Sequence, residues 1–77
     1  MRKRIIEILT ELRPEFDFTA AGDFIDEGML DSFDIVNLVM ALDAQYNISI
    51  DGLDIIPSNF SSIESIESLL IKNGAVQ

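Results

Sequence analysis

The sequence contains no cysteine and no histidine. Without cysteine there is no disulfide framework, and nothing indicates export. The two absences also exclude Ser–His and Cys–His nucleophiles and imidazole ligands for a metal. Carboxylates are plentiful, but acids in open loops of so short a chain have no pocket that would tune them for acid–base catalysis. We therefore expect a protein that is not an enzyme.

Basic residues are scarce and unevenly placed. The net charge is −9, and positions 14 to 71 contain acids but no base. Phosphate binding needs clustered lysine and arginine, so nucleic acid is not an expected partner. An acidic surface instead favours encounter with basic patches on other proteins, although the same charge also keeps a small domain soluble.

Long apolar runs are also missing. No run approaches the roughly 18–20 residues of a membrane span, and no signal-peptide pattern opens the chain. The chain has 77 residues, of which 48% are hydrophobic, which is enough for one domain over residues 1–77 with a compact core. We expect a cytoplasmic monomer that does not span a membrane.

The abundant acids raise the alternative of a calcium site. A loop that begins at Asp23 would place Gly28 correctly, but Ile25 would take a ligand position. A loop that begins at Asp43 would place Ile48 where glycine is needed. No metal site is therefore expected.

Hydrophobic periodicity predicts an all-α fold with three longer helices and one short one. The first helix is expected over residues 2–12 and ends before Pro14. A short helix, or one or two helical turns, is expected over residues 54–59, with Pro57 in a first turn. It follows an extended connector that buries Ile48 and Ile50. The last helix follows a capping box expected from Ser61 and Glu64.

The central helix, which ends near Tyr46, has two apolar faces. Asp31 and Ser32 are both good residues for its N-cap, and Asp34 adds negative charge in its first turn. One broad stripe is expected to face the core and comprises Ile35, Leu38, Val39, Leu42 and Tyr46. A second stripe comprises Phe33, Val36 and Met40. A helix with two apolar faces needs something to cover each of them.

The loop over residues 15–30 has no clear periodicity. Loops of this length are unusual in compact domains unless they are functional or anchored by their own side chains. Gly28 is expected to supply a turn with positive φ before the central helix. The candidate anchors are apolar: Phe16, Phe18, Phe24, Ile25, Met29 and Leu30.

The segment from Gly28 to Asp34 resembles the phosphopantetheine attachment site of acyl and peptidyl carrier proteins. That motif reads Gly-x-x-Asp-Ser-(Leu/Phe)-Asp before an amphipathic helix, and Gly28, Asp31, Ser32, Phe33 and Asp34 occupy its positions. The resemblance extends over nearly the whole chain and implies a small carrier-protein bundle. It implies that a 4′-phosphopantetheine arm from coenzyme A is attached to Ser32. The thiol of the arm would hold an acyl or aminoacyl group as a thioester.

The resemblance also implies partner enzymes. These are a phosphopantetheinyl transferase, a ligase that loads the cargo, and a downstream acyltransferase or synthase with a basic docking patch. The expected partner face follows Ser32 and comprises Phe33, Asp34, Val36, Asn37, Met40 and Asp43.

Three departures from the carrier pattern bear on the cargo. Asn37 and Ala44 stand where fatty-acid carriers often have glutamate, and Phe33 replaces the commoner leucine. The departures favour aminoacyl or specialised acyl cargo, such as that of D-alanine carriers. Transfer pathways of the fatty-acid, polyketide, nonribosomal-peptide and D-alanine types all stay open.

Two alternatives to this interpretation stay open. Ser32 is also explained by an ordinary capping serine, in which case the chain is an unmodified acidic module that binds a partner through the same face. The alternative for Val36 and Met40 is that the long loop covers them.

Overall fold

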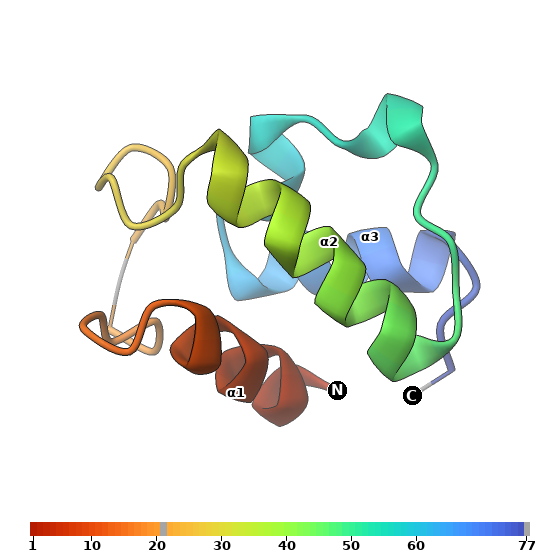
Figure 1. Ribbon diagram of the computed structural model, residues 1–77, viewed down its shortest axis with the longest axis horizontal. Helices are drawn as coiled ribbons and strands as arrows, with labels where there is room; N and C mark the ends of the chain where they lie inside the picture. Colours follow the sequence, from red (N-terminus) through yellow and green to blue (C-terminus); the bar gives the residue numbers. More distant parts are fainter. Residues whose placement is uncertain (21, 77) are drawn as a thin grey trace.

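The computed structural model describes residues 1–20 and 22–76. Its elements are α1 (Arg2–Leu12), α2 (Ser32–Tyr46) and α3 (Ile63–Lys72), with the 3₁₀ turns η1 (Gly52–Asp54) and η2 (Pro57–Phe60) between α2 and α3 (Figure 1). No strand occurs in these residues, so the expected all-α fold is confirmed. Over the same residues, no helix is both long and apolar enough to cross a membrane.

The core lies between the three helices. α1 contacts both α2 and α3, and η2 contacts both α2 and α3. The predicted inward stripes are confirmed, because Ile5 and Leu9 of α1, Leu42 of α2 and Ile66 and Leu70 of α3 are completely buried. Burial of these apolar side chains stabilises the bundle and fixes which side of α2 faces solvent.

The long loop between α1 and α2 is anchored as expected. Phe18 and Phe24 are buried and pack edge to face, with ring centroids 5.1 Å apart. The Phe24 N–H donates to the Ser61 carbonyl at 2.8 Å, which ties the loop to the start of α3. Met29 is also buried, and Gly28 has φ +72°, a left-handed conformation that glycine adopts without strain. The loop therefore delivers the chain to the start of α2 in a fixed position.

The segment in which a short helix, or one or two helical turns, was expected contains two separate 3₁₀ turns, η1 and η2. Pro57 begins η2, as expected, and it disfavours α conformation in the residue before it, so the two turns do not join into one helix. Ile56 is accordingly extended, with φ −127° and ψ 149°. The connector before η1 buries Ile50, while Ile48 is half-buried.

The capping box of α3 differs from the one predicted. Ser62, not Ser61, is the N-cap, and the Ser65 N–H donates to its hydroxyl at 3.1 Å. Ser61 has φ −81° and ψ −18°, so it still belongs to the turn at the end of η2, and its hydroxyl donates to the Ser58 carbonyl. Glu64 lies one position too early to reach back to the Ser62 N–H.

Candidate functional site

Ser32 is the first residue of α2 and is exposed to solvent. The N-cap is Asp31, whose backbone is extended with φ −110° and ψ −176°. The Asp34 N–H donates to Asp31 Oδ1 at 2.9 Å, and the Asp31 N–H donates to Asp34 Oδ2 at 3.1 Å. The two aspartates therefore form the capping box. Of the two sequence candidates for the cap, Asp31 takes the role, and the Ser32 hydroxyl is left outside it.

Asp34 was expected on the exposed partner face, and this placement is wrong. The residue is only 6% exposed. Its carboxylate turns back toward the N-cap, and Oδ2 also lies 3.4 Å from Nη1 of Arg13. A buried carboxylate is stabilised by such hydrogen bonds and by an opposite charge. Asp34 thus holds the start of α2 and is withdrawn from partners.

Arg13 connects the end of α1 to the start of α2. It is the C-cap residue of α1, and its guanidinium contacts Glu15 at 3.3 Å in addition to Asp34. The same guanidinium lies over the Phe16 ring, 5.4 Å from the centroid. Sequence reasoning missed this contact, because residues 13 and 34 are far apart in the chain and no local pattern relates them.

The carboxylate of Asp31 is held in its charged form. Its pKa is lowered, chiefly because the Asp34 N–H donates to it, and the positive charge of Arg13 contributes less. The start of α2 is therefore an ordered, negatively charged turn with an exposed primary hydroxyl at Ser32.

The second apolar stripe of α2 faces solvent. Phe33 is 73% exposed, Val36 53% and Met40 59%. The long loop therefore leaves Val36 and Met40 uncovered. Asn37 is half-buried beside them. Asp43 is also half-buried, and its carboxylate accepts a hydrogen bond from the Ile50 N–H at 3.1 Å, so it holds the connector after α2.

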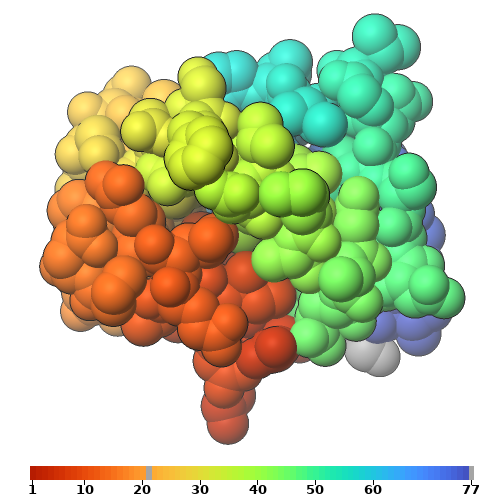
Figure 2. All heavy atoms as spheres, in the orientation of Figure 1, coloured from red at the N-terminus to blue at the C-terminus, as the bar shows by residue number. Residues whose placement is uncertain are grey.

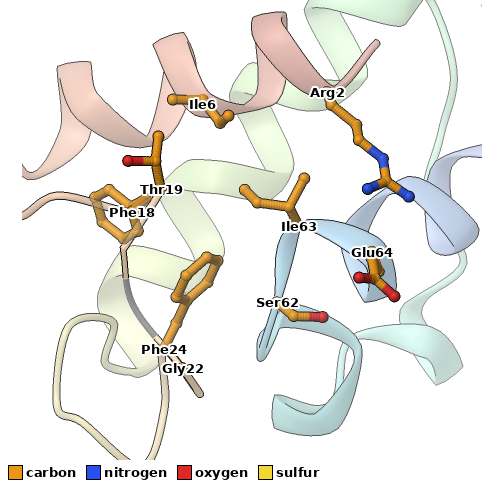
Figure 3. A pocket seen from close by; sticks show the side chains of 9 residues that line it. All are labelled: Arg2, Ile6, Phe18, Thr19, Gly22, Phe24, Ser62, Ile63 and Glu64. Atoms are coloured by element: carbon orange, nitrogen blue, oxygen red, sulfur yellow. The ribbon is translucent and has the colours of Figure 1, made fainter.

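One pocket of the structure is not lined by Ser32. It has a volume of about 380 Å³ and is enclosed by α1, the long loop and the start of α3 (Figure 3). Ile6, Phe18 and Phe24 form much of its wall, while Arg2 and Glu64 lie near its edge. Ser32 is instead exposed on the open surface of the molecule.

A covalent arm fits this open surface. An exposed hydroxyl that takes no part in the helix cap is accessible to an enzyme, and it tolerates a bulky substituent without unfolding the cap. Asp31 and Asp34 fix the helix start whether or not the hydroxyl is substituted. The residues present are thus compatible with a phosphopantetheine group on Ser32.

A small helical bundle that presents an exposed serine at the first turn of its central helix has the arrangement of a carrier domain. The sequence is 31% identical over 75 residues to Aminoacyl carrier protein 1 of Bradyrhizobium diazoefficiens, and the alignment covers 92% of this chain and 82% of that relative. The chain therefore belongs to the family of acyl and aminoacyl carrier proteins. No family model matches the sequence, and no solved structure matches it significantly.

The excess of acids leads to a prediction about salt. Within the described residues the ion pairs involve Arg2, Arg4, Arg13 and Lys72, and most acids have no basic partner. Exposed pairs of this kind contribute little to stability. We expect added salt at pH 7 to raise the melting temperature, because it screens repulsion among the unpaired acids. A melting temperature that is flat or falls from low to moderate salt would contradict this.

Acidification is expected to have two opposite effects. Protonation of unpaired acids relieves repulsion, so mild acidification should not lower the melting temperature. The pKa of Asp31 is lowered by the Asp34 N–H, and that of Asp54 by its hydrogen bond from Lys72. Because these folded-state pKa values are depressed, their stabilisation is present above the unfolded pKa of about 3.9 and is lost as the pH falls through the folded values. Thermal melts between pH 7 and pH 3 measure both effects.

Proposed function

We propose that this protein carries an acyl or aminoacyl group as a thioester on a 4′-phosphopantetheine arm attached to Ser32. The observation that carries the proposal is the exposed Ser32 hydroxyl at the start of α2, outside a capping box made by its neighbours. Membership of the carrier family supports it.

The attachment step uses coenzyme A as the donor. The Ser32 oxygen forms a bond to the phosphorus that carries the pantetheine, and the bond from that phosphorus to the nucleotide half of coenzyme A breaks. The nucleotide half leaves with the bridging oxygen, and the serine proton passes to a base of the transferase or to solvent. No residue of this chain needs to act as a catalyst, so the protein is proposed to be a substrate of other enzymes.

The arm supplies the sulfur that this sequence lacks. In the loading step the terminal thiol gives up its proton and bonds to the carbonyl carbon of an activated acyl group, whose leaving group departs. The chain contributes a fixed attachment point and a surface for recognition. Tethering also raises the local concentration of the cargo at a docked enzyme without tight binding.

The start of α2 does not act as a strong phosphate site. The helix dipole stabilises an anion at an exposed terminus by about 0.3–1 kcal/mol. A carboxylate at roughly 6 Å in water opposes this by about 0.7 kcal/mol, and both Asp31 and Asp34 lie in the first turn. Arg13 offsets part of the charge of Asp34. The acids are better explained as caps than as contacts for the phosphodiester.

We propose aminoacyl or specialised acyl groups as the cargo. Asn37 and Ala44 remove negative charge from positions where fatty-acid carriers often have glutamate, and the relative is named an aminoacyl carrier protein. The partners proposed are a phosphopantetheinyl transferase, a ligase that loads the cargo and an enzyme that accepts it, in the cytoplasm. Of the proposed partner face, Phe33, Val36 and Met40 are the exposed apolar members.

Intact mass measurement tests the attachment site. The protein is incubated with coenzyme A and a broad-specificity phosphopantetheinyl transferase, and we expect a gain of one phosphopantetheine group. Ser32→Ala should abolish the gain, whereas Ser68→Ala, at an exposed serine of α3, should leave it unchanged. Because Ser32 is not the cap, its replacement should change the free energy of unfolding by no more than about 0.5 kcal/mol.

Two outcomes would contradict the proposal. Modification of the Ser32→Ala protein at another serine would show that the site is wrong. A wild-type protein that gains no mass, while a known carrier in the same mixture does, would favour the unmodified interaction module.

A further inference from the structure

Ser32 lies in a short stretch that apolar burial does not hold. Leu30 before it and Ile35 after it are buried in the core. Between them residues 31–33 are exposed, and the one buried side chain is that of Asp34. A buried carboxylate stays in place only where hydrogen bonds and an opposite charge compensate its lost hydration. The position of the Ser32 hydroxyl therefore depends on what holds this carboxylate.

One oxygen of the Asp34 carboxylate joins the start of α2 to the end of α1. Oδ2 accepts the Asp31 N–H at 3.1 Å and lies 3.4 Å from Nη1 of Arg13. Figure 2 shows the atoms at the end of α1 and in the loop after it (orange) bordering those at the start of α2 (yellow-green). The charge of Arg13 therefore keeps Oδ2 turned toward the peptide N–H that directly precedes Ser32.

Arg13 is itself held from several sides. Its backbone N–H donates to the Leu9 carbonyl at 2.9 Å, which fixes it to the last turn of α1. Its guanidinium lies 3.3 Å from the Glu15 carboxylate and 5.4 Å from the centroid of the Phe16 ring. The position of the end of α1 is thus passed on, through Arg13 and the Asp34 carboxylate, to the first turn of α2.

We propose that Arg13 is a positioning residue for the modification of Ser32 and acts through Asp34. The inference rests on the proposed function, because the reaction concerned is the transfer of phosphopantetheine. In that transfer the serine oxygen must approach the phosphorus of coenzyme A in one orientation. A change far from the reacting atoms that misplaces them by about 1 Å can cost about 100-fold in rate. The role requires no contact between Arg13 and the reacting atoms.

Modification rates of Arg13 variants test this role. We measure kcat/KM with coenzyme A and a broad-specificity phosphopantetheinyl transferase, at a temperature at which circular dichroism shows every variant folded. Arg13→Met should be slower than wild type by about tenfold, because methionine fills much of the space but offers no charge to Asp34. Arg13→Lys should recover part of the rate, because it restores the charge without the planar guanidinium.

Arg2→Met is the matched control. Arg2 also joins α1 to another helix through an acid, because its Nη2 lies 3.2 Å from the Glu67 carboxylate of α3. This pair is formed at the start of α1, away from the start of α2 (Figure 1). The loss of an ion pair between helices at this end should leave kcat/KM at the wild-type value.

The Asp34→Asn background shows whether Arg13 acts through Asp34. The asparagine oxygen can still accept the Asp31 N–H, but it carries no charge for Arg13 to hold. Arg13→Met should therefore lower kcat/KM by less than about twofold in this background. An equal slowing in both backgrounds would mean that Arg13 contacts the transferase directly, which would overturn the inference.

Backbone ¹⁵N relaxation of the folded protein gives a readout that does not depend on the transferase. In Arg13→Met the order parameters at Asp31 and Ser32 should fall from about 0.85 toward about 0.6, because the turn is no longer held. The value at Leu42, in the buried part of α2, should stay at about 0.85. Unchanged values at Asp31 and Ser32 would contradict a positioning role.

The proposed function and this inference fail in different ways. If wild type gains no phosphopantetheine while a known carrier in the same mixture does, the proposed function fails and the inference falls with it. If wild type is modified at Ser32 and Arg13→Met is equally fast, only the inference is overturned. Equal slowing of Arg2→Met and Arg13→Met would also overturn it, because the effect would then belong to any ion pair between helices.

Discussion

Replacing Leu42 with alanine is expected to lower the free energy of unfolding by about 2–5 kcal/mol. The Leu42 side chain is completely buried between the helices, so its truncation removes apolar contacts and leaves a cavity. Met40→Ala, two residues away on the same helix, should change the free energy of unfolding by no more than about 0.5 kcal/mol, because Met40 is 59% exposed. Two similar truncations thus have very different expected effects.

Denaturant melts of the two variants measure this difference. The free energy of unfolding of a natural domain is only about 5–15 kcal/mol. The Leu42→Ala protein should therefore unfold at a much lower denaturant concentration than wild type. Met40→Ala should instead slow modification or loading at Ser32. Equal and large losses of stability would mean that Met40 contributes to the core, and the partner face would have to be sought elsewhere.

Much of the fold was predictable because it depends on local periodicity. The spacing of Ile5, Leu9 and Leu42 at helical intervals is enough to mark core-facing stripes, and all of them are buried. The apolar residues of the long loop could also be predicted to act as anchors. An apolar residue such as Phe24, in a loop without helical periodicity, is buried only if it packs on the helices. Gly28 was predicted to adopt positive φ from the turn that must precede α2.

The errors in the prediction arise where several polar residues compete for one local role. Ser61 and Ser62 are equally good caps by composition, and the choice depends on where η2 ends. Asp34 satisfied both a capping pattern and an acidic partner motif, and only its 6% exposure shows that the cap prevails. For residues 54–59 the sequence left open a short helix or one or two helical turns. The extended Ile56 before Pro57 keeps η1 and η2 apart.

Some features of the candidate site were predictable from the local sequence, and others depend on how distant parts of the chain pack. Ser32 was predicted as the attachment site from its motif, and the structure shows it exposed at the start of α2; the attachment itself stays a prediction. The contact of Arg13 with Asp34 depends on how α1 and α2 pack, which no local pattern specifies.

The last prediction concerns this Arg13–Asp34 pair, which joins α1 to the turn that holds Ser32. Loss of one partner of a fully buried pair costs about 3–5 kcal/mol, because the other charge is left uncompensated. The Arg13 side chain is 31% exposed whereas that of Asp34 is 9% exposed, so we expect Arg13→Met to cost less, about 2 kcal/mol. Arg4→Met is the control, because the Arg4–Glu7 pair is exposed on both sides and should contribute less than about 1 kcal/mol.

A double-mutant cycle identifies the pair as the cause. In Asp34→Asn the amide oxygen still accepts the Asp31 N–H, but the charge that Arg13 compensates is gone. Arg13→Met should therefore cost clearly less in the Asp34→Asn background than in wild type. Arg13→Lys should recover only part of the loss, because lysine cannot contact Asp34 and Glu15 together while covering the Phe16 ring. Equal costs of Arg13→Met in both backgrounds would mean that Arg13 stabilises the chain through its packing on Phe16, and that the start of α2 is held by the capping box alone.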